Sequence, residues 1–390
     1  MSYTKVYATP GWGNVALMGT GHFISDFFCN VLPVMLPILA VRYGISYSQS
    51  AALFMVFSVS TNFLQPPLGL WADRKDIAFL MPLSLATGAV FACMVGLTSN
   101  LYVLILIILL AGVCASAFHP IAAQAVYAVS IKRRRALCTS LFIAGGNVGF
   151  ATAPVIVAAY VESFGDKLLP VLAIPALIVT YLTCHRHLHH LPRPQFARTG
   201  NVPLKSMLTR QFILLNSAIA LRSWTYCAFV VFLPLLLTAH GYSTVEAAFA
   251  LLVLLVGTVA GGLIAGSLSD IFPLKLIIIA TLVLTGAGAA FFLYDVEISF
   301  LSLTALFITG AGMYGSTPSA IVWAQRLLPH NAAFAASMML GFTFGLGYIE
   351  SVITGFVGDY VGLQLGLAVT VVPAAILGVI IMLFLKEPPA

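Results

Sequence analysis

Three ionisable side chains lie in the middle of long apolar stretches of this sequence. They are Asp26, Arg222 and Glu350, and each is several residues away from any other charge. A charged group at the centre of a bilayer costs about 2.5–3.5 kcal/mol on insertion scales, so it normally faces a protein interior or a water-filled cavity. The pattern predicts that these residues bind protons or solutes, with static ion pairs as the alternative.

His22 lies four residues before Asp26, a spacing that puts both side chains on one face of a helix. An imidazole beside a buried carboxylate can share a proton with it, because the two groups titrate as a pair. We therefore expect His22 and Asp26 to couple a proton to the function, with Glu350 as a second proton site or a substrate contact. Ordinary packing and hydrogen bonding are the competing interpretation.

Other polar and aromatic residues of the apolar stretches are candidates for binding a substrate. Arg222 suits an anionic group, and the rings of Trp224 and Tyr226 could stack on a ligand. His119 and Asn147 lie in other apolar stretches and could line the same cavity. Core packing and hydrogen bonds between helices are the alternative for all of them.

A short motif occurs twice, each time between two apolar runs. Its members are Gly69, Asp73 and Arg74 in the first copy and Gly266 and Asp270 in the second, with the two glycines 197 residues apart. We expect charge pairs at this motif to form an inner gate that breaks on opening. A plain turn at a basic membrane face is the alternative, and the second copy is partial because no basic residue follows its Asp.

The composition defines the broad class of protein. Hydrophobic residues make up 61% of the 390-residue chain and charged residues 8%, which excludes a soluble globular domain. Twelve apolar runs reach the roughly 20 residues that a membrane helix needs, and their continuous apolarity predicts helices rather than strands. With the repeated motif, they predict an all-α integral membrane protein of twelve transmembrane helices in two pseudo-symmetric six-helix bundles.

A polar, proline-containing stretch near the middle of the chain predicts a linker between two halves. The predicted domains are an N-terminal six-helix bundle at 1–190, a cytoplasmic linker at 191–210 and a C-terminal six-helix bundle at 211–390. Of the 18 Lys and Arg residues, all but three fall in segments that lie inside if both termini are cytoplasmic. This bias predicts a multi-pass membrane protein in that orientation.

The twelve spans, the central linker and the Gly-x-x-x-Asp-Arg loop resemble the major facilitator superfamily. The first half is more narrowly similar to the fosmidomycin resistance protein group of that superfamily. The segments that carry this similarity are His22-Phe23-Ile24-Ser25-Asp26, Gln65-Pro66-Pro67-Leu68-Gly69, Phe118-His119-Pro120 and Gly145-Gly146-Asn147-Val148-Gly149. The resemblance implies proton-driven export of a small drug or metabolite, by a transporter that works as a monomer.

The resulting hypothesis is a proton-coupled secondary active transporter that exports a small anionic or zwitterionic solute or drug by alternating access. A symporter or uniporter that imports a small metabolite is the alternative. It is favoured by Ala153-Pro154, where antiporters of the superfamily commonly carry Gly-Pro.

Several classes of function have no support in the sequence. No nucleophile triad, nucleotide-binding loop or zinc motif is recognisable, so we expect no enzyme activity, no cofactor and no bound metal. The histidines between His185 and His190 have a spacing that could bind a metal, but nothing metal-like surrounds them and we expect them at the membrane interface. The net charge of +6 is explained by basic inner loops beside anionic lipid and requires no nucleic acid.

Overall fold

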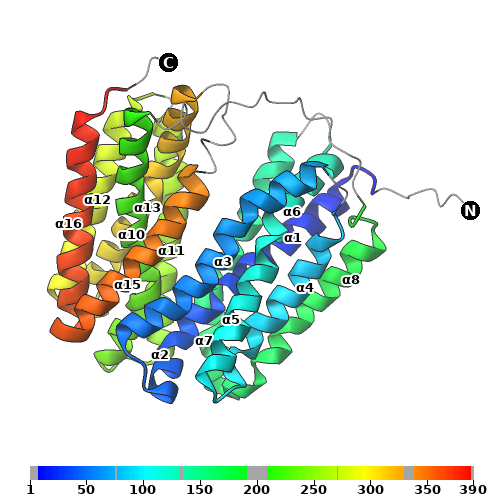
Figure 1. The fold of residues 1–390 in the computed structure, drawn as a ribbon, viewed down its shortest axis with the longest axis horizontal. Coiled ribbons are helices and arrows are strands. Elements are labelled where there is room, and N and C mark those ends of the chain that lie inside the picture. The colour runs from blue at the N-terminus through cyan, green and yellow to red at the C-terminus, as the bar shows by residue number, and fades with distance from the viewer. Residues whose placement is uncertain are drawn as a thin grey trace, which may run out of the picture. The chain divides into compact units, whose positions relative to one another are not determined.

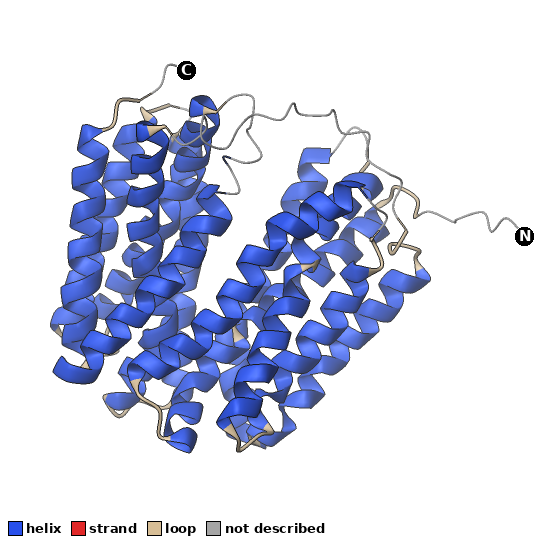
Figure 2. Ribbon diagram, viewed as in Figure 1, coloured by secondary structure: helices blue, strands red, loops and turns tan. Residues whose placement is uncertain are grey.

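The computed structural model describes residues 8–74, 77–131, 135–190, 209–269, 271–328, 335 and 338–387. Within these residues every regular element is a helix (Figure 2). The predicted all-α fold is confirmed.

Ten helical elements are described between residues 8 and 190. They are α1 (Trp12–Cys29), α2 (Val31–Tyr43), α3 (Tyr47–Arg74), α4 (Leu80–Cys93), the 3-10 helix η1 (Met94–Gly96), α5 (Leu101–Ser116), α6 (Phe118–Val129), α7 (Arg135–Phe164), the 3-10 helix η3 (Asp166–Ala173) and α8 (Ile174–His185) (Figure 1).

The remaining described helices lie between residues 209 and 387. They are α10 (Arg210–Ala239), α11 (Thr244–Leu268), α12 (Leu274–Tyr294), α13 (Phe300–Leu327), the π-helix η5 (Met338–Phe342), α15 (Thr343–Val361) and α16 (Leu363–Phe384).

These elements combine into twelve spanning stretches across the described residues. Five stretches are made of two consecutive pieces, namely α1 with α2, α4 with η1, α5 with α6, η3 with α8, and η5 with α15. Eight of the stretches are long and apolar enough, by length and composition, to cross a membrane. The architecture matches the twelve-helix prediction.

Internal contacts divide the chain into two compact units. Unit 1 contains the described residues of 1–35 and 56–197, and unit 2 contains those of 36–55 and 198–390. The end of α2 and the first turns of α3 therefore group with the second half of the sequence. The linker proposed at 191–210 falls largely outside the described residues and stays a prediction.

Two helix breaks position polar groups inside the spans of unit 1. Between α1 and α2, the buried side-chain amide of Asn30 donates to the backbone carbonyl of Phe150 at 2.6 Å. Between α5 and α6, the helix is interrupted at Ala117, three residues before Pro120. Proline lacks an N–H and clashes with the preceding turn, so the break there is expected. It places His119 in the first turn of α6.

Close helix packing in both units depends on glycine. Gly145 and Gly149 of α7 face the backbone of Gly19 and Phe23 in α1, and a Cβ atom at either glycine would overlap that backbone. Gly261 allows α11 to approach α13 in the same way. Small residues at such contacts let helix backbones pack directly, as is common in membrane helix bundles.

Candidate functional site

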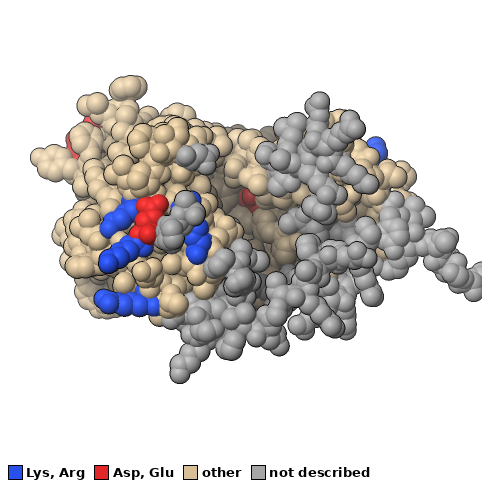
Figure 3. All heavy atoms as spheres, turned by 90° about the horizontal axis from the view of Figure 1, so that it is seen from above, with Lys and Arg blue, Asp and Glu red and all other residues tan. Residues whose placement is uncertain are grey.

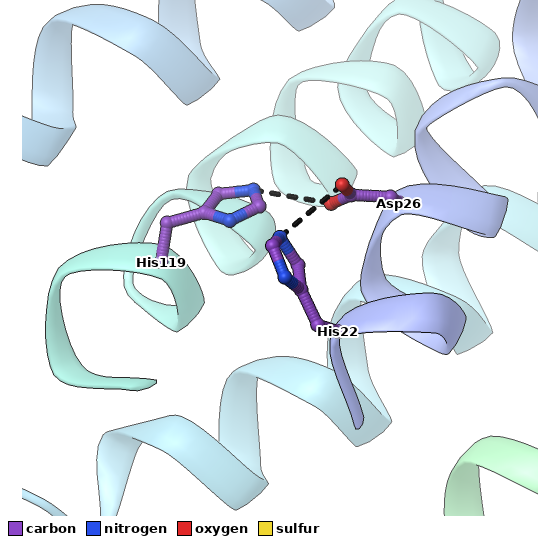
Figure 4. A group of neighbouring side chains, drawn as sticks. All are labelled: His22, Asp26 and His119. Atoms are coloured by element: carbon purple, nitrogen blue, oxygen red, sulfur yellow. Dashed lines mark ion pairs between the residues drawn. The ribbon is translucent and has the colours of Figure 1, made fainter. Parts of the chain in front are cut away.

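One carboxylate in unit 1 contacts two imidazoles (Figure 4). His22 Nε2 lies 3.2 Å from Asp26 Oδ2, and His119 Nε2 lies 3.5 Å from Asp26 Oδ1. His22 and Asp26 come from adjacent turns of α1, and His119 comes from the start of α6. The structure thus joins the predicted pair of α1 with a third residue that the sequence placed only in another apolar stretch.

The backbone fixes which ring nitrogen of His22 faces the acid. His22 Nδ1 lies 2.8 Å from the carbonyl oxygen of Phe142, which can only accept a hydrogen bond, so Nδ1 carries a hydrogen. An ionised carboxylate can also only accept. A direct hydrogen bond between His22 Nε2 and Asp26 would therefore need one further proton, either on the imidazole or on the carboxyl group.

The walls of this cluster hold the His22 ring in place. The ring stacks on that of Phe142, with centroids 4.1 Å apart and planes 22° apart, and Phe118 lies at 6.1 Å. A Cβ atom at Gly146 of α7 would lie 2.5 Å from Asp26 Oδ2 and 2.6 Å from the His22 ring. The glycine-rich stretch of α7 therefore leaves the space that the carboxylate and the imidazole occupy.

The same donors have a spacing that a divalent metal could use. One nitrogen of each histidine and one oxygen of Asp26 all lie within 4.8 Å of one another, and among the described residues this is the group with such a spacing. The observed contacts are explained by protons alone. The histidines between His185 and His190 show ring contacts with one another but no such ligand geometry within the described part of the chain.

Unit 2 contains a different kind of buried charge. The Arg222 side chain, on α10, is fully buried, and none of its three nitrogens has a hydrogen-bond partner among the described residues. Its guanidinium carbon lies 4.9 Å from the ring centroid of Phe344 and 5.9 Å from that of Tyr314. These cation–π contacts supply favourable electrostatics but leave all the guanidinium hydrogens available.

Aromatic rings from three helices surround this arginine. Tyr226 of α10 lies 5.4 Å from Phe344 and 6.0 Å from Tyr314, measured between centroids, and the latter two rings are 5.9 Å apart. The Arg222 guanidinium is therefore shielded from water by aromatic rings, and its N–H groups have no acceptor among the described residues. Such a group can bind a carboxylate, phosphate or similar anion through paired hydrogen bonds.

The other predicted binding residues have diverse surroundings. Glu350 of α15 has a buried carboxyl oxygen, Oε2, without a hydrogen-bond partner among the described residues. Trp224 is half-buried, and its indole N–H donates to the hydroxyl of Thr354 at 2.8 Å. Asn147 of α7 is exposed.

The gate motif is only partly described. The backbone of Gly69, Asp73 and Arg74 belongs to the end of α3. The side chains of Asp73 and Arg74, and all of Asp270, lie outside what the structure describes. Gly266 lies in α11, where a Cβ atom would meet the ring of Pro318 at 3.6 Å.

Charged side chains gather on one face of unit 2 (Figure 3). Lys275, in the first turn of α12, donates to the carbonyls of Leu383 and Leu385 at the end of α16. Glu387 accepts from the N–H groups of Leu274 and Lys275. Arg326 ends the neighbouring α13. Lys275 and Arg326 thus lie at the same end of unit 2, and the orientation of this end in the membrane stays a prediction.

Some site residues carry no signal in the sequence. The carbonyl of Phe142 orients His22, but any residue supplies a carbonyl. Tyr314 and Phe344 pack on Arg222, but aromatic residues are common throughout the spans. Gly146 does carry a signal in the sequence, because it lies in the glycine-rich segment that resembles known transporters.

Solved structures with the same fold are membrane transporters. A bacterial homologue of the human lysosomal transporter Spinster, in an inward-facing and unoccupied conformation, has a TM-score of 0.75 at 15% identity and covers 95% of this chain and 94% of its own. The nucleoside transporter NupG has a TM-score of 0.75 at 15% identity, covering 96% and 100%. The chain shares the all-helical fold of these two proteins.

A family model described as the Major Facilitator Superfamily matches residues 18–350. The chain belongs to the major facilitator superfamily and is a membrane transporter of small solutes. The fosmidomycin resistance protein of Escherichia coli (strain K12) is 21% identical over 369 residues, which cover 92% of this chain and 89% of that protein. YfnC of Bacillus subtilis (strain 168), an uncharacterized MFS-type transporter, is 22% identical over 357 residues, covering 89% and 87%. The resemblance inferred from sequence motifs is confirmed.

Proposed function

We propose that this protein is a proton-coupled secondary active transporter that exports a small anionic or zwitterionic solute by alternating access. The observation that carries the proposal is the Asp26 carboxylate held between two imidazoles, with His22 Nδ1 committed to the carbonyl of Phe142. That geometry needs a proton that can be gained or lost without moving the backbone. A mobile proton inside the membrane is what coupling to a proton gradient requires.

Arg222 supplies the substrate side of the mechanism. Its unused donors bind the anionic group of the solute, and Tyr226 forms part of the wall behind it. Glu350 carries a second proton or pairs with a cationic group of a zwitterion. Proton binding at Asp26 and solute binding at Arg222 then alternate as the transporter changes the side to which it is open. His119, Asn147 and Trp224 are proposed to line the solute path.

The remaining parts of the proposal concern the cell. The basic helix ends lie on the cytoplasmic side of a bacterial inner membrane, both termini are inside, and the protein works as a monomer. The motif of Gly69, Asp73 and Arg74, repeated at Gly266 and Asp270, forms the inner gate.

Import by symport or uniport remains the second candidate, and one observation favours it. Pro154 lies inside α7 and follows an alanine instead of the glycine that is common in antiporters of this superfamily. The direction of proton movement on addition of solute distinguishes the two.

The test uses everted membrane vesicles with a dye that reports an acid interior. A thermal-shift screen of phosphate, acetate, glycine and fosmidomycin against the purified protein selects the solute. Adding it to energised wild-type vesicles should release protons from the interior, and Asp26→Asn should abolish this release. Asp295→Asn is the matched control, because Asp295 is an exposed acid outside the spans.

Two results would contradict the proposal. Proton release by Asp26→Asn at the wild-type rate would remove the coupling role of this residue. Proton uptake on adding the solute would favour symport over export.

A further inference from the structure

The first turn of α3 is capped by a carboxylate from another helix. Asp359, near the end of α15, accepts through Oδ1 from the N–H of Tyr47 at 2.7 Å. Its Oδ2 accepts from the N–H of Ser48 at 3.2 Å and from the Ser48 hydroxyl at 2.5 Å. The first N–H groups of a helix have no partner within the helix and form the positive end of its dipole. A carboxylate therefore binds there through charge-assisted hydrogen bonds.

The contact continues along α3 beyond the cap. A Cβ atom at Gly355 of α15 would lie 2.8 Å from the backbone of Ser48, so the two helices touch backbone to backbone. Two turns further along α3, the ring of Phe54 packs edge-to-face on Tyr348, with centroids 5.0 Å apart. The start of α3 is thus packed and hydrogen-bonded on α15 over its first two turns.

The helix α3 is divided between the two compact units. The described residues of α3 up to 55 group with unit 2, and those from 56 onward group with unit 1. Glu387 offers a direct comparison, because it caps the start of α12 through two backbone N–H groups, at 2.9 and 3.1 Å, with both partners in unit 2. The chemistry of the two caps is the same, but only the cap at Asp359 holds a helix that continues into the other unit.

We propose that Asp359 is the latch of an outer gate: its carboxylate holds the start of α3 on α15 and must release it before the transporter opens to the outside. The proposal rests on the proposed function, because it uses alternating access and an orientation that puts the start of α3 outside. Opening breaks three hydrogen bonds and the glycine contact, and closing restores them. The free energy of these contacts sets the fraction of molecules that are closed on the outer side.

Asp359→Asn tests the latch with little change in shape. Asparagine keeps one acceptor oxygen and replaces the other with an NH₂ donor, which faces the two donors of Ser48. The readout is the distance between spin labels at Gln49, which is exposed near the start of α3, and Tyr294, which is exposed at the end of α12. The labels are attached in lipid nanodiscs to a variant whose six native cysteines are replaced by Ser.

In this experiment, a longer-distance population should rise roughly tenfold relative to the closed one, as expected for the loss of one or two charge-assisted hydrogen bonds. Gly355→Ala should shift the distances in the same direction, because its methyl group pushes Ser48 away. Ser48→Ala, which removes only the hydroxyl bond, should give a smaller shift. Glu387→Gln is the matched control and should leave the distances unchanged.

Unchanged distances in both Asp359→Asn and Gly355→Ala would overturn the proposal, even if thermal stability falls, because Asp359 would then be only a structural cap. An equal shift in Glu387→Gln would also overturn it. The distances require neither a solute nor a proton gradient, so loss of proton coupling in Asp26→Asn and failure of the latch give separate results.

Discussion

The two units treat a buried charge in opposite ways. In unit 1, both oxygens of Asp26 contact imidazoles, and His22 is in turn anchored to a backbone carbonyl. In unit 2, Arg222 is fully buried with no hydrogen-bond partner among the described residues. A charge with internal partners needs only a proton to change its state. A buried cation without hydrogen-bond partners carries a desolvation cost that an incoming anion relieves.

The largest effect that tests this comparison is expected from Arg222→Ala. Removing the cation should weaken anion binding by about 100-fold, as is typical when one partner of a buried charge pair is truncated. The same change should raise the melting temperature of the solute-free protein, because it deletes an unsatisfied buried charge. Thermal shifts with and without the selected solute measure both effects.

Arg210→Ala serves as the control for this experiment, since Arg210 is an exposed residue at the start of the same helix. Wild-type affinity in Arg222→Ala would mean that the guanidinium is structural, and the contrast between the two units would disappear.

A smaller effect is expected from Gly146→Ala, which tests the cluster of unit 1. The added methyl group would press on Asp26 and His22, so overpacking should cost about 1–3 kcal/mol of stability. Displacement of the pair should also slow proton-coupled flux roughly tenfold or more. Gly262→Ala is the control, because a Cβ atom at Gly262 would have its nearest neighbour, a ring carbon of Tyr314, at the ordinary contact distance of 3.8 Å. Proton-coupled flux at the wild-type rate in Gly146→Ala would show that coupling does not depend on the arrangement of Asp26 and His22.

The smallest effect is expected from Trp224→Phe. This change keeps an aromatic ring but removes the hydrogen bond to Thr354, so stability should fall by about 0.5–1.5 kcal/mol. Solute affinity should change less than threefold if the ring only borders the site around Arg222. A larger loss of affinity, measured by titration calorimetry, would place the indole N–H in solute binding.

The sequence predicted the fold well because each span must bury about 20 apolar residues, and that requirement leaves a direct trace in composition. Asp26 and His22 were predictable from their cost in the membrane and their one-turn spacing. The surroundings of Asp26 and Arg222 were not predictable. The carbonyl of Phe142, which orients His22 beside Asp26, and the ring of Phe344, which packs on Arg222, come from distant helices. The grouping of the first turns of α3 with α15 depends on tertiary contacts and also had no local signature.

The grouping of residues 36–55 with the second half has a consequence for attempts to express the halves separately. A fragment beginning after the linker would lack these residues, so Gly355 would face lipid or water instead of the backbone of Ser48. The matching N-terminal fragment would carry a stretch whose packing surface is missing. We expect the C-terminal fragment to accumulate stably only when the N-terminal fragment is produced in the same cell. Producing the two fragments together therefore tests the packing of residues 36–55 on the second half.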